Sequence, residues 1–200
     1  MMRFSTAKGY SLFQDAADLL DIIRQSKRGA GRQTGNQWPW ENTIVGVISN
    51  SDDRVPGVLR DLGIDVAGHR FDHKDQYSTG GRKFPPHIDF SLLSYDAGCE
   101  KPNPEIFHKA HEIALKLPAA SDVDDYEHLH VGDSISKDVL GSQAAGWNSI
   151  LIDRDGHKES QMQDDAGAES EETKTIHIVR NLVDVRLWKH GLKATSLRLP

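Results

Sequence analysis

Residues 130–147 read HVGDSISKDVLGSQAAGW, a segment in which an apolar run, a glycine turn and a helical pattern follow one another. The run that ends at Val131 predicts a short strand, and residues 136–145 have the spacing of a helix that ends at Gly146. Residues 149–152 are again apolar and predict the next strand. A strand, a helix and a second strand in this order indicate a parallel sheet covered by helices.

The turn after the first of these strands carries two carboxylates, Asp133 and Asp138, five residues apart. Gly132 leaves room for a ligand to approach them, and carboxylate oxygens suit a hard divalent cation such as Mg2+. A plainer interpretation is that Asp133 or Ser134 caps the helix that follows. The pattern alone is compatible with both.

The same alternation of elements precedes this segment. Residues 43–49 (TIVGVIS) form a continuous apolar run rich in β-branched residues, which predicts a strand buried on both faces. Residues 53–62 predict a helix, residues 89–94 a short strand, and Pro104 the start of another helix. We therefore expect an α/β fold with a doubly wound parallel sheet, in which ligands bind at the carboxyl ends of the strands.

Two further groups of polar residues lie at strand or helix ends. Ser49 and Asn50 place a hydroxyl and an amide directly after an apolar strand, where they could hold a phosphoryl oxygen or form an ordinary turn. Lys101 lies in the segment GCEKPNP, just before the helix that begins at Pro104, and offers a positioned charge for an anion. Taken alone, this lysine is typical of a solvated side chain in a turn.

The order, placement and spacing of these three groups resemble motifs II, III and IV of the haloacid dehalogenase (HAD) superfamily. The likeness is strongest to its small phosphatases with a helical cap. It extends from about Tyr10 to Arg154 and includes the segments SNSDDR, DFSLLSYDAGCEKPNPEIF and HVGDSISKDVLGSQAAGW. Three short motifs in the right order are more specific than any one of them. The resemblance implies a HAD Rossmann-like core.

The resemblance also implies roles for individual residues. Ser49 would donate its hydroxyl to the transferring phosphoryl group with Asn50 beside it, and Lys101 would neutralise the charge of that group. Asp133 would bind Mg2+ directly, and Asp138 directly or through water. In such hydrolases an aspartate attacks phosphorus, and a second aspartate two residues later acts as acid and base.

The motif with that nucleophile, an apolar strand ending in Asp-x-Asp, is not found before Ser49 in this sequence. We therefore expect a core that lacks the first-motif strand and most of the cap. Asp122-Val123-Asp124 has the right spacing but follows no strand. Asp153-Arg154-Asp155 does follow a strand and would serve a circularly permuted enzyme, but the fifth strand of this family normally ends in a similar Asp-Arg pair.

Composition divides the chain further. We predict a residual cap or connector helix and loop over residues 1–42 and a HAD-like core over 43–154. Residues 155–175 are rich in charge and poor in apolar side chains, which predicts an acidic disordered loop. Residues 176–200 are apolar enough at first to return to the core and then form a tail.

The bulk properties narrow the classes of partner and compartment. The net charge is −6, which gives no electrostatic attraction to nucleic acid, and no window is apolar enough for a membrane span. The single cysteine, Cys99, excludes an intrachain disulfide, and the N-terminus has no secretory signal pattern. We expect an intracellular protein, cytoplasmic or nuclear, whose ligand is a small phosphorylated metabolite.

Two classes of function follow. The first is a Mg2+-dependent phosphatase of the HAD type, which the chain as written would not complete because no nucleophile is found. The second is a non-catalytic relative, a truncated isoform or pseudoenzyme that acts by binding a protein partner of unknown kind. The presence or absence of the Asp-x-Asp strand separates the two.

Overall fold

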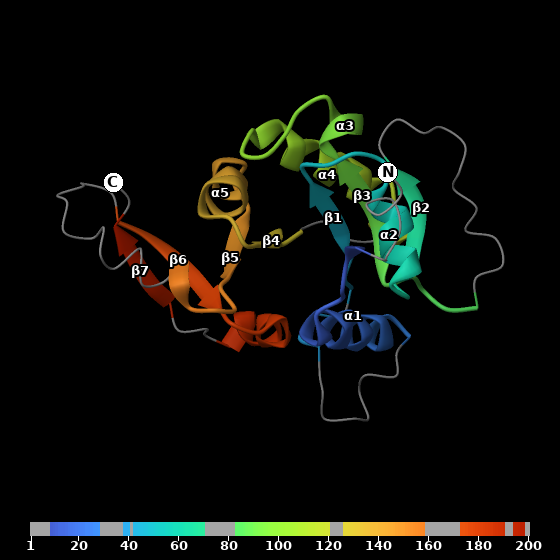
Figure 1. The fold of residues 1–200 in the computed structure, drawn as a ribbon, viewed down its shortest axis with the longest axis horizontal. Coiled ribbons are helices and arrows are strands. Elements are labelled where there is room, and N and C mark those ends of the chain that lie inside the picture. The colour runs from blue at the N-terminus through green and yellow to red at the C-terminus, as the bar shows by residue number, and fades with distance from the viewer. Residues whose placement is uncertain are drawn as a thin grey trace. The chain divides into compact units, whose positions relative to one another are not determined.

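The computed structural model describes residues 9–28, 38–40, 42–70, 83–120, 126–158, 173–190 and 194–198. The chain divides into two compact units, unit 1 (Met1–Tyr126) and unit 2 (Glu127–Pro200). Their elements are drawn in Figure 1. Among the described residues, no helix is long and apolar enough to cross a membrane.

Unit 1 is built around a parallel sheet of three strands in the order β1-β3-β2. The register of β1 and β3 pairs their last residues, Ser49 and Leu93. The described elements are, in chain order, α1 (Gln14–Lys27), β1 (Gly46–Ser49), α2 (Val55–Asp61), β2 (Val66–Arg70), β3 (Ile88–Leu93), α3 (Ser94–Ala97), α4 (Pro104–Leu115) and a 3-10 turn, η3 (Pro118–Ala120).

Unit 2 contains a second sheet, of four strands in the order β4-β5-β6-β7. The first three strands are parallel, and β7 runs antiparallel to β6. The elements are β4 (Leu129–Gly132), a π-helical segment η4 (Ile135–Leu140), α5 (Gly141–Ala144), β5 (Asn148–Ile152), β6 (Thr173–Val179), a 3-10 segment η5 (Leu182–His190) and β7 (Ala194–Arg198).

Helix α4 shows how sequence pattern becomes packing in unit 1. Pro104 occupies its first turn, and the side chain of Asn103 caps it by accepting a hydrogen bond from Glu105 N at 3.0 Å. Its apolar face buries Ile106 and Phe107 completely. Such aromatic and aliphatic burial is the main source of stability in a domain of this size.

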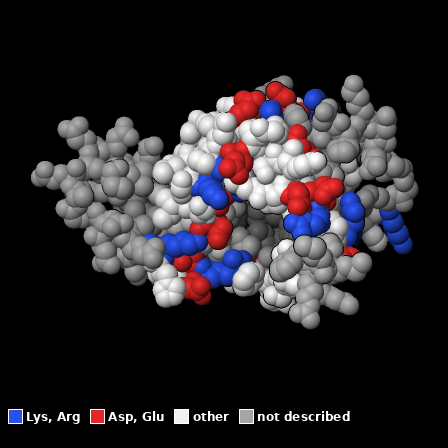
Figure 2. All heavy atoms as spheres, turned by 45° about the horizontal axis from the view of Figure 1, so that its top comes forward, with Lys and Arg blue, Asp and Glu red and all other residues white. Residues whose placement is uncertain are grey.

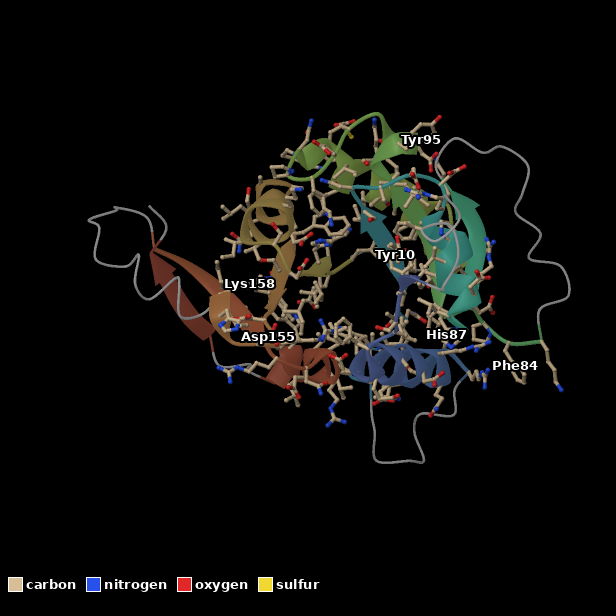
Figure 3. All side chains as sticks on the ribbon, viewed as in Figure 1. Tyr10, Phe84, His87, Tyr95, Asp155 and Lys158 are labelled. Carbon is tan, nitrogen blue, oxygen red and sulfur yellow. The ribbon has the colours of Figure 1, made fainter. Side chains whose placement is uncertain are left out.

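Helix α1 is part of the packing of unit 1. Leu20 packs against the buried cluster of Ile64, Val66 and Ile88. Lys27 Nζ lies 2.5 Å from a carboxylate oxygen of Asp89, at the start of β3. Other polar contacts also tie the helix to this region, which includes His87 (Figure 3). The amino-terminal end of β3, opposite Ser49 and Leu93, is therefore tied to α1.

In unit 2, the buried side chains Val139, Leu151 and Ile176 form one cluster. Val139 belongs to η4, while Leu151 and Ile176 come from the neighbouring strands β5 and β6. The π-helical segment is thus packed directly against the sheet.

The α/β fold that the sequence predicts is confirmed, and every predicted strand and helix of residues 43–154 is present within a few residues. The described strands nevertheless form two sheets, one in each unit. β1 is half-buried, and Gly46 is exposed, so the prediction of a strand buried on both faces is wrong. The reason is that β1 is the last strand of its sheet, with a described partner on one side.

Three strands escaped prediction: β2, β6 and β7, the last of which (Ala194–Arg198) lies in the segment predicted as a tail. β2 contains Gly68 and His69 and shifts its register against β3, so it has neither alternation nor a continuous apolar run. β6 begins at Thr173, inside the segment predicted as an acidic loop. Residues 159–172 of that segment lie outside the described residues. Ile176, Val179 and Val185 are buried, as the apolar pattern after residue 175 predicts.

On one face, side chains of both charges are mixed. On the face shown in Figure 2, acidic and basic residues lie beside one another without a broad region of one sign among the residues drawn in colour. That mixture matches the small net charge of −6.

Candidate functional site

In unit 1, the candidate residues Ser49, Asn50 and Lys101 meet at the carboxyl ends of β1 and β3. We call them the lysine cluster. Ser49 is the last residue of β1 and is half-buried. Lys101 belongs to the loop between α3 and α4, which begins at Gly98 with a φ of 66°. A left-handed φ favours glycine, and here it ends α3 and turns the chain toward β1.

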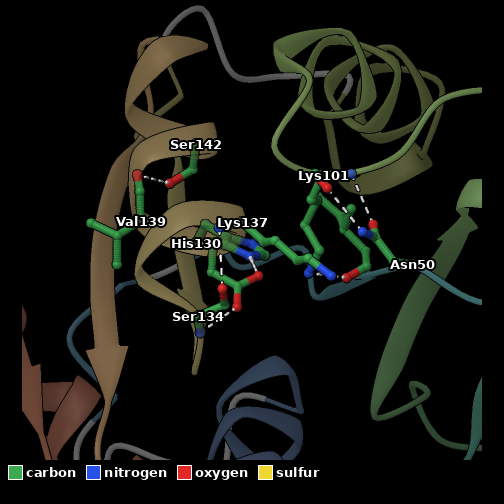
Figure 4. Close-up of polar contacts among 9 residues, drawn as sticks. Asn50, Lys101, His130, Ser134, Lys137, Val139 and Ser142 are labelled. Atoms are coloured by element: carbon green, nitrogen blue, oxygen red, sulfur yellow. Dashed lines mark hydrogen bonds and ion pairs between the residues drawn. The ribbon is translucent and has the colours of Figure 1, made fainter. Parts of the chain in front are cut away.

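The side chain of Asn50 holds the backbone of Lys101 on both sides. Its amide nitrogen donates to Lys101 O at 2.9 Å, and its amide oxygen accepts from Lys101 N at 2.8 Å (Figure 4). Both polar ends of the Asn50 side chain are therefore used within the protein. This geometry favours a positioning role for Asn50. Direct binding of phosphate by Asn50 stays a prediction.

The Lys101 ammonium points back to the same strand end. Lys101 Nζ donates to the carbonyl oxygen of Ile48 at 2.9 Å, one residue before Ser49. An ammonium has three protons, and a backbone carbonyl uses one of them. The contact places a positive charge at the carboxyl end of β1, which favours the binding of an anion there.

A shallow, open depression of about 400 Å³ adjoins the lysine cluster. It is lined by residues of the turn after β1, of α3 and of the loop before Lys101, among them Ser51, Asp52, Tyr95 and Cys99. Asp52 accepts hydrogen bonds from the Arg54 guanidinium, which lowers the pKa of Asp52 and raises that of Arg54. Both side chains of this pair stay ionised near neutral pH.

In unit 2, Asp133 follows β4 and has an exposed carboxylate, with 80% of the side chain accessible. The ammonium of Lys158 lies 3.6 Å from Asp133 Oδ2 and also donates to the backbone oxygen of Asp133. Lys158 comes from the turn after β5 and is labelled in Figure 3. A cation of the protein itself thus contacts the carboxylate that the sequence assigns to Mg2+.

Asp138 differs from Asp133 because it is buried, with 4% of its surface exposed. Its Oδ1 lies 3.0 Å from His130 Nε2, and its Oδ2 accepts from Ser134 N at 2.8 Å (Figure 4). Ser134 in turn caps η4 by accepting from Lys137 N at 3.2 Å. The plainer interpretation of the sequence is therefore correct for Ser134. We call His130, Asp133, Ser134 and Asp138 the aspartate cluster.

The donor set of the aspartate cluster suits one side of a Mg2+ site. Asp133 offers an exposed carboxylate, whereas both oxygens of Asp138 accept contacts inside the protein. Within the described part of the chain, no group of three or more His, Cys, Asp or Glu side chains is placed to hold a metal ion. Mg2+ commonly uses one or two carboxylates and fills the remaining positions with water or substrate phosphate.

The alternative nucleophile, Asp153, has a structural role in the fold. Its side chain is buried, with 3% exposure, and its Oδ2 accepts from Lys158 N at 2.9 Å. The carboxylate therefore stabilises the turn that contains Asp155 and Lys158. The other Asp-x-Asp sequence, at residues 122–124, lies outside the described residues.

The sequence analysis missed two residues: His130 of the aspartate cluster, and Lys158, which contacts Asp133. His130 stands in the predicted strand two residues before Gly132, and a histidine alternating with apolar residues is a weak signal for an inward-facing polar side chain. Lys158 lies in a polar stretch with many charges, and nothing in its pattern singles it out.

Comparisons with known proteins agree on one family. A family model described as "HAD-hyrolase-like" matches residues 98–185. An uncharacterized hydrolase of Schizosaccharomyces pombe is 36% identical over 150 residues, which are 75% of this chain and 50% of that protein. Haloacid dehalogenase-like hydrolase domain-containing protein 3 of Mus musculus is 34% identical, over 54% of this chain and 32% of its own length. The chain thus spans about half or less of these relatives.

Solved structures show the same fold at lower identity. A HAD phosphatase from Thermococcus onnurineus gives a TM-score of 0.52 at 17% identity, over 90% of this chain and 59% of its own. The HAD-hydrolase YfnB from Bacillus subtilis, bound to magnesium, gives 0.53 at 17% identity, over 90% of this chain and 56% of its own. These likenesses show the fold. The family model and the relatives give the family: the chain belongs to the haloacid dehalogenase-like (HAD) hydrolase superfamily.

Proposed function

We propose that residues 1–200 carry the phosphate- and metal-binding groups of a Mg2+-dependent phosphohydrolase that acts on a small phosphomonoester. The observation that carries the proposal is the fixed position of Lys101. Its backbone is held by Asn50, and its ammonium lies 2.9 Å from Ile48 O at the end of β1. A lysine held beside a serine at the carboxyl end of a parallel strand is suited to a phosphoryl group.

The chemistry assigned to each residue follows from its donors. The Ser49 hydroxyl donates to a phosphoryl oxygen, and the Lys101 ammonium offsets the negative charge that the phosphoryl group brings. Asp133 supplies an exposed carboxylate oxygen for the metal. Bound Mg2+ supplies further charge stabilisation to a transferring phosphoryl group. Among the comparison structures, one is described as a phosphatase and another as bound to magnesium.

The nucleophile requires a separate assignment. The sequence of residues 1–48 contains no Asp-x-Asp, and the Asp153 carboxylate is buried and accepts a hydrogen bond from Lys158 N. We therefore assign to residues 1–200 the binding of phosphate and metal but no covalent step. On this proposal the chain binds phosphate without turning over a phosphate ester.

Phosphate binding provides the direct test. Inorganic phosphate is titrated into the 200-residue chain with Mg2+ present, and the amide signals of Ser49 and Asn50 are followed by NMR. We expect the shifts to saturate with phosphate. The affinity for phosphate should be at least about tenfold weaker in Lys101→Met, because a positioned charge is lost. Lys116→Met, at the exposed end of α4, is the matched control and should bind like the parent. Equal binding by Lys101→Met would contradict the proposal.

The second candidate is a non-catalytic protein that acts through a partner. It is favoured by the lack of an Asp-x-Asp sequence in residues 1–48 and by the Lys158 ammonium, which already supplies a cation at Asp133. The phosphate titration separates the two. A chain that is folded by circular dichroism but shows no phosphate-dependent shift at Ser49 or Asn50 supports the second candidate.

A further inference from the structure

His130 and Asp138 form a buried polar pair in unit 2. The pair joins β4 to η4, with His130 Nε2 and Asp138 Oδ1 3.0 Å apart. The exposed fractions of the two residues are 9% and 4%. A buried carboxylate is costly unless hydrogen bonds compensate the loss of water, so each partner depends on the other.

Gly132 shows how closely Asp138 lies on the strand. A Cβ atom built on Gly132 would stand 2.2 Å from Asp138 Cγ and 2.4 Å from Asp138 Oδ2. No side chain fits between β4 and this carboxylate. Packing therefore requires a glycine in the Val-Gly-Asp sequence, because its missing side chain leaves the space that Asp138 occupies.

The π-helical turn directs Asp138 toward the space beside Gly132. Asp138 N and Val139 N both donate to Ser134 O, at 2.8 and 3.2 Å, so the first turn of η4 includes an i to i+5 bond. Wide turns of this kind are rare and often mark functional sites. The Asp138 carboxylate then returns to accept the Ser134 N–H at 2.8 Å, which closes the loop on itself.

From these contacts we propose that His130 is a positioning residue for Asp133, the carboxylate assigned to Mg2+. By holding Asp138 against β4, His130 fixes the Ser134 N–H and thereby the turn that presents the neighbouring Asp133 outward. Asp138 acts through the same contact, as a support for the turn. The proposal rests on the proposed function for the role of Asp133, but the contact chain from His130 to Ser134 stands on its own geometry.

Substituting His130 by glutamine or by asparagine tests whether the position of the donor nitrogen matters. Glutamine can place its amide nitrogen near the position of His130 Nε2, whereas the shorter asparagine cannot reach Asp138. We expect His130→Gln to keep the contact and His130→Asn to lose it. His177→Gln changes another histidine of the same sheet, which packs on Trp188, and is the matched control.

The first readout needs no metal. The Ser134 amide proton, hydrogen-bonded to a carboxylate, is expected to be protected from exchange and shifted downfield in the parent chain. His130→Gln and His177→Gln should retain both properties. His130→Asn should lose them, while the other amide signals still indicate a folded chain. An unchanged Ser134 amide in His130→Asn would overturn the proposal. If His130→Asn does not fold, Asp138→Asn is used, since its amide cannot accept from both His130 and Ser134.

The second readout is the affinity for Mg2+, followed by the amide shift of Asp133. Loss of an outer partner of a metal ligand typically weakens metal binding about 10- to 100-fold, so we expect at least about a tenfold loss in His130→Asn and less than about threefold in His130→Gln. Equal affinity in all three chains would contradict the positioning role. If Mg2+ causes no shift that Asp133→Asn abolishes, the metal assignment of the proposed function fails, and the Ser134 amide still decides whether His130 holds the turn.

Discussion

The lysine cluster and the aspartate cluster achieve order by different means. In the lysine cluster, the contacts of Asn50 and Ile48 with Lys101 join residues 51 and 53 positions apart in the sequence. In the aspartate cluster, the bonds from His130 to Asp138 and from Ser134 to Asp138 span eight and four positions. The first arrangement requires the completed sheet and loop of unit 1, while the second is built into one strand and the turn that follows it.

This difference suggests how each cluster responds to change. A cluster made by distant segments loses its geometry when the fold loosens, because loop closure over many residues opposes it. A local cluster depends instead on the exact space available at a few positions. The predictions below test this contrast.

The largest expected effect concerns turnover by the whole chain. With phosphate and metal groups but no assigned nucleophile, residues 1–200 should hydrolyse p-nitrophenyl phosphate no faster than the Mg2+-containing buffer, since loss of a covalent catalyst costs several orders of magnitude. The release of p-nitrophenol measures this directly. Turnover that disappears in Asp153→Asn would instead identify Asp153 as a nucleophile and reverse the assignment of that residue to a turn.

The distant contacts of the lysine cluster should be the costlier of the two to remove. Asn50→Ala removes both hydrogen bonds between the Asn50 side chain and the Lys101 backbone, and each lost bond at a part-buried site costs about 1–3 kcal/mol. We expect about 3 kcal/mol of destabilisation by urea melting. Asn148→Ala, at an exposed position of β5, serves as the control. A loss below about 0.5 kcal/mol, the usual range for surface substitutions, would show that the clamp is not needed.

The aspartate cluster should be sensitive to added volume. Gly132→Ala places a Cβ where Asp138 Cγ lies 2.2 Å away, so the carboxylate or the strand must move. Overpacking of this kind costs about 1–3 kcal/mol. Gly57→Ala is the matched control, because a Cβ there meets nothing within 4 Å and the site is helical. Denaturant melting of the two variants should differ by about 2 kcal/mol, and equal stabilities would mean that Asp138 has room to move.

Much of this architecture could be predicted from the sequence, and the failures have identifiable causes. The run TIVGVIS predicts a strand because β-branched residues dominate it, and the apolar run of residues 149–152 predicts another. β2 carries no such signal, since Gly68 and His69 interrupt it. The candidate residues were found by type and spacing, but the inward orientation of Asn50 and Asp138 depends on partners that only the folded chain brings near. Sequence spacing alone gives no information about which oxygen faces which donor.

The smallest expected effect concerns Lys158. Its ammonium lies 3.6 Å from Asp133 Oδ2, on a carboxylate that is 80% exposed, so the pair is well screened by solvent. Lys158→Met should remove a competing cation and strengthen Mg2+ binding at Asp133 by about two- to threefold, which corresponds to less than about 1 kcal/mol. Calorimetry or the Asp133 amide shift measures it. Weaker binding in Lys158→Met would show that the lysine supports the metal carboxylate.

β1 and β4 each stand last in their sheets, and each has one described neighbour to pair with. A terminal strand presents a row of backbone donors and acceptors that any extended segment can extend. For β1 this row belongs to a half-buried apolar sequence without a charged residue between Gly46 and Ser49. The self-association of the chain should therefore depend on its concentration, and high concentration should favour pairing of strands from different molecules. Dilution or an added complementary strand should favour the dispersed state.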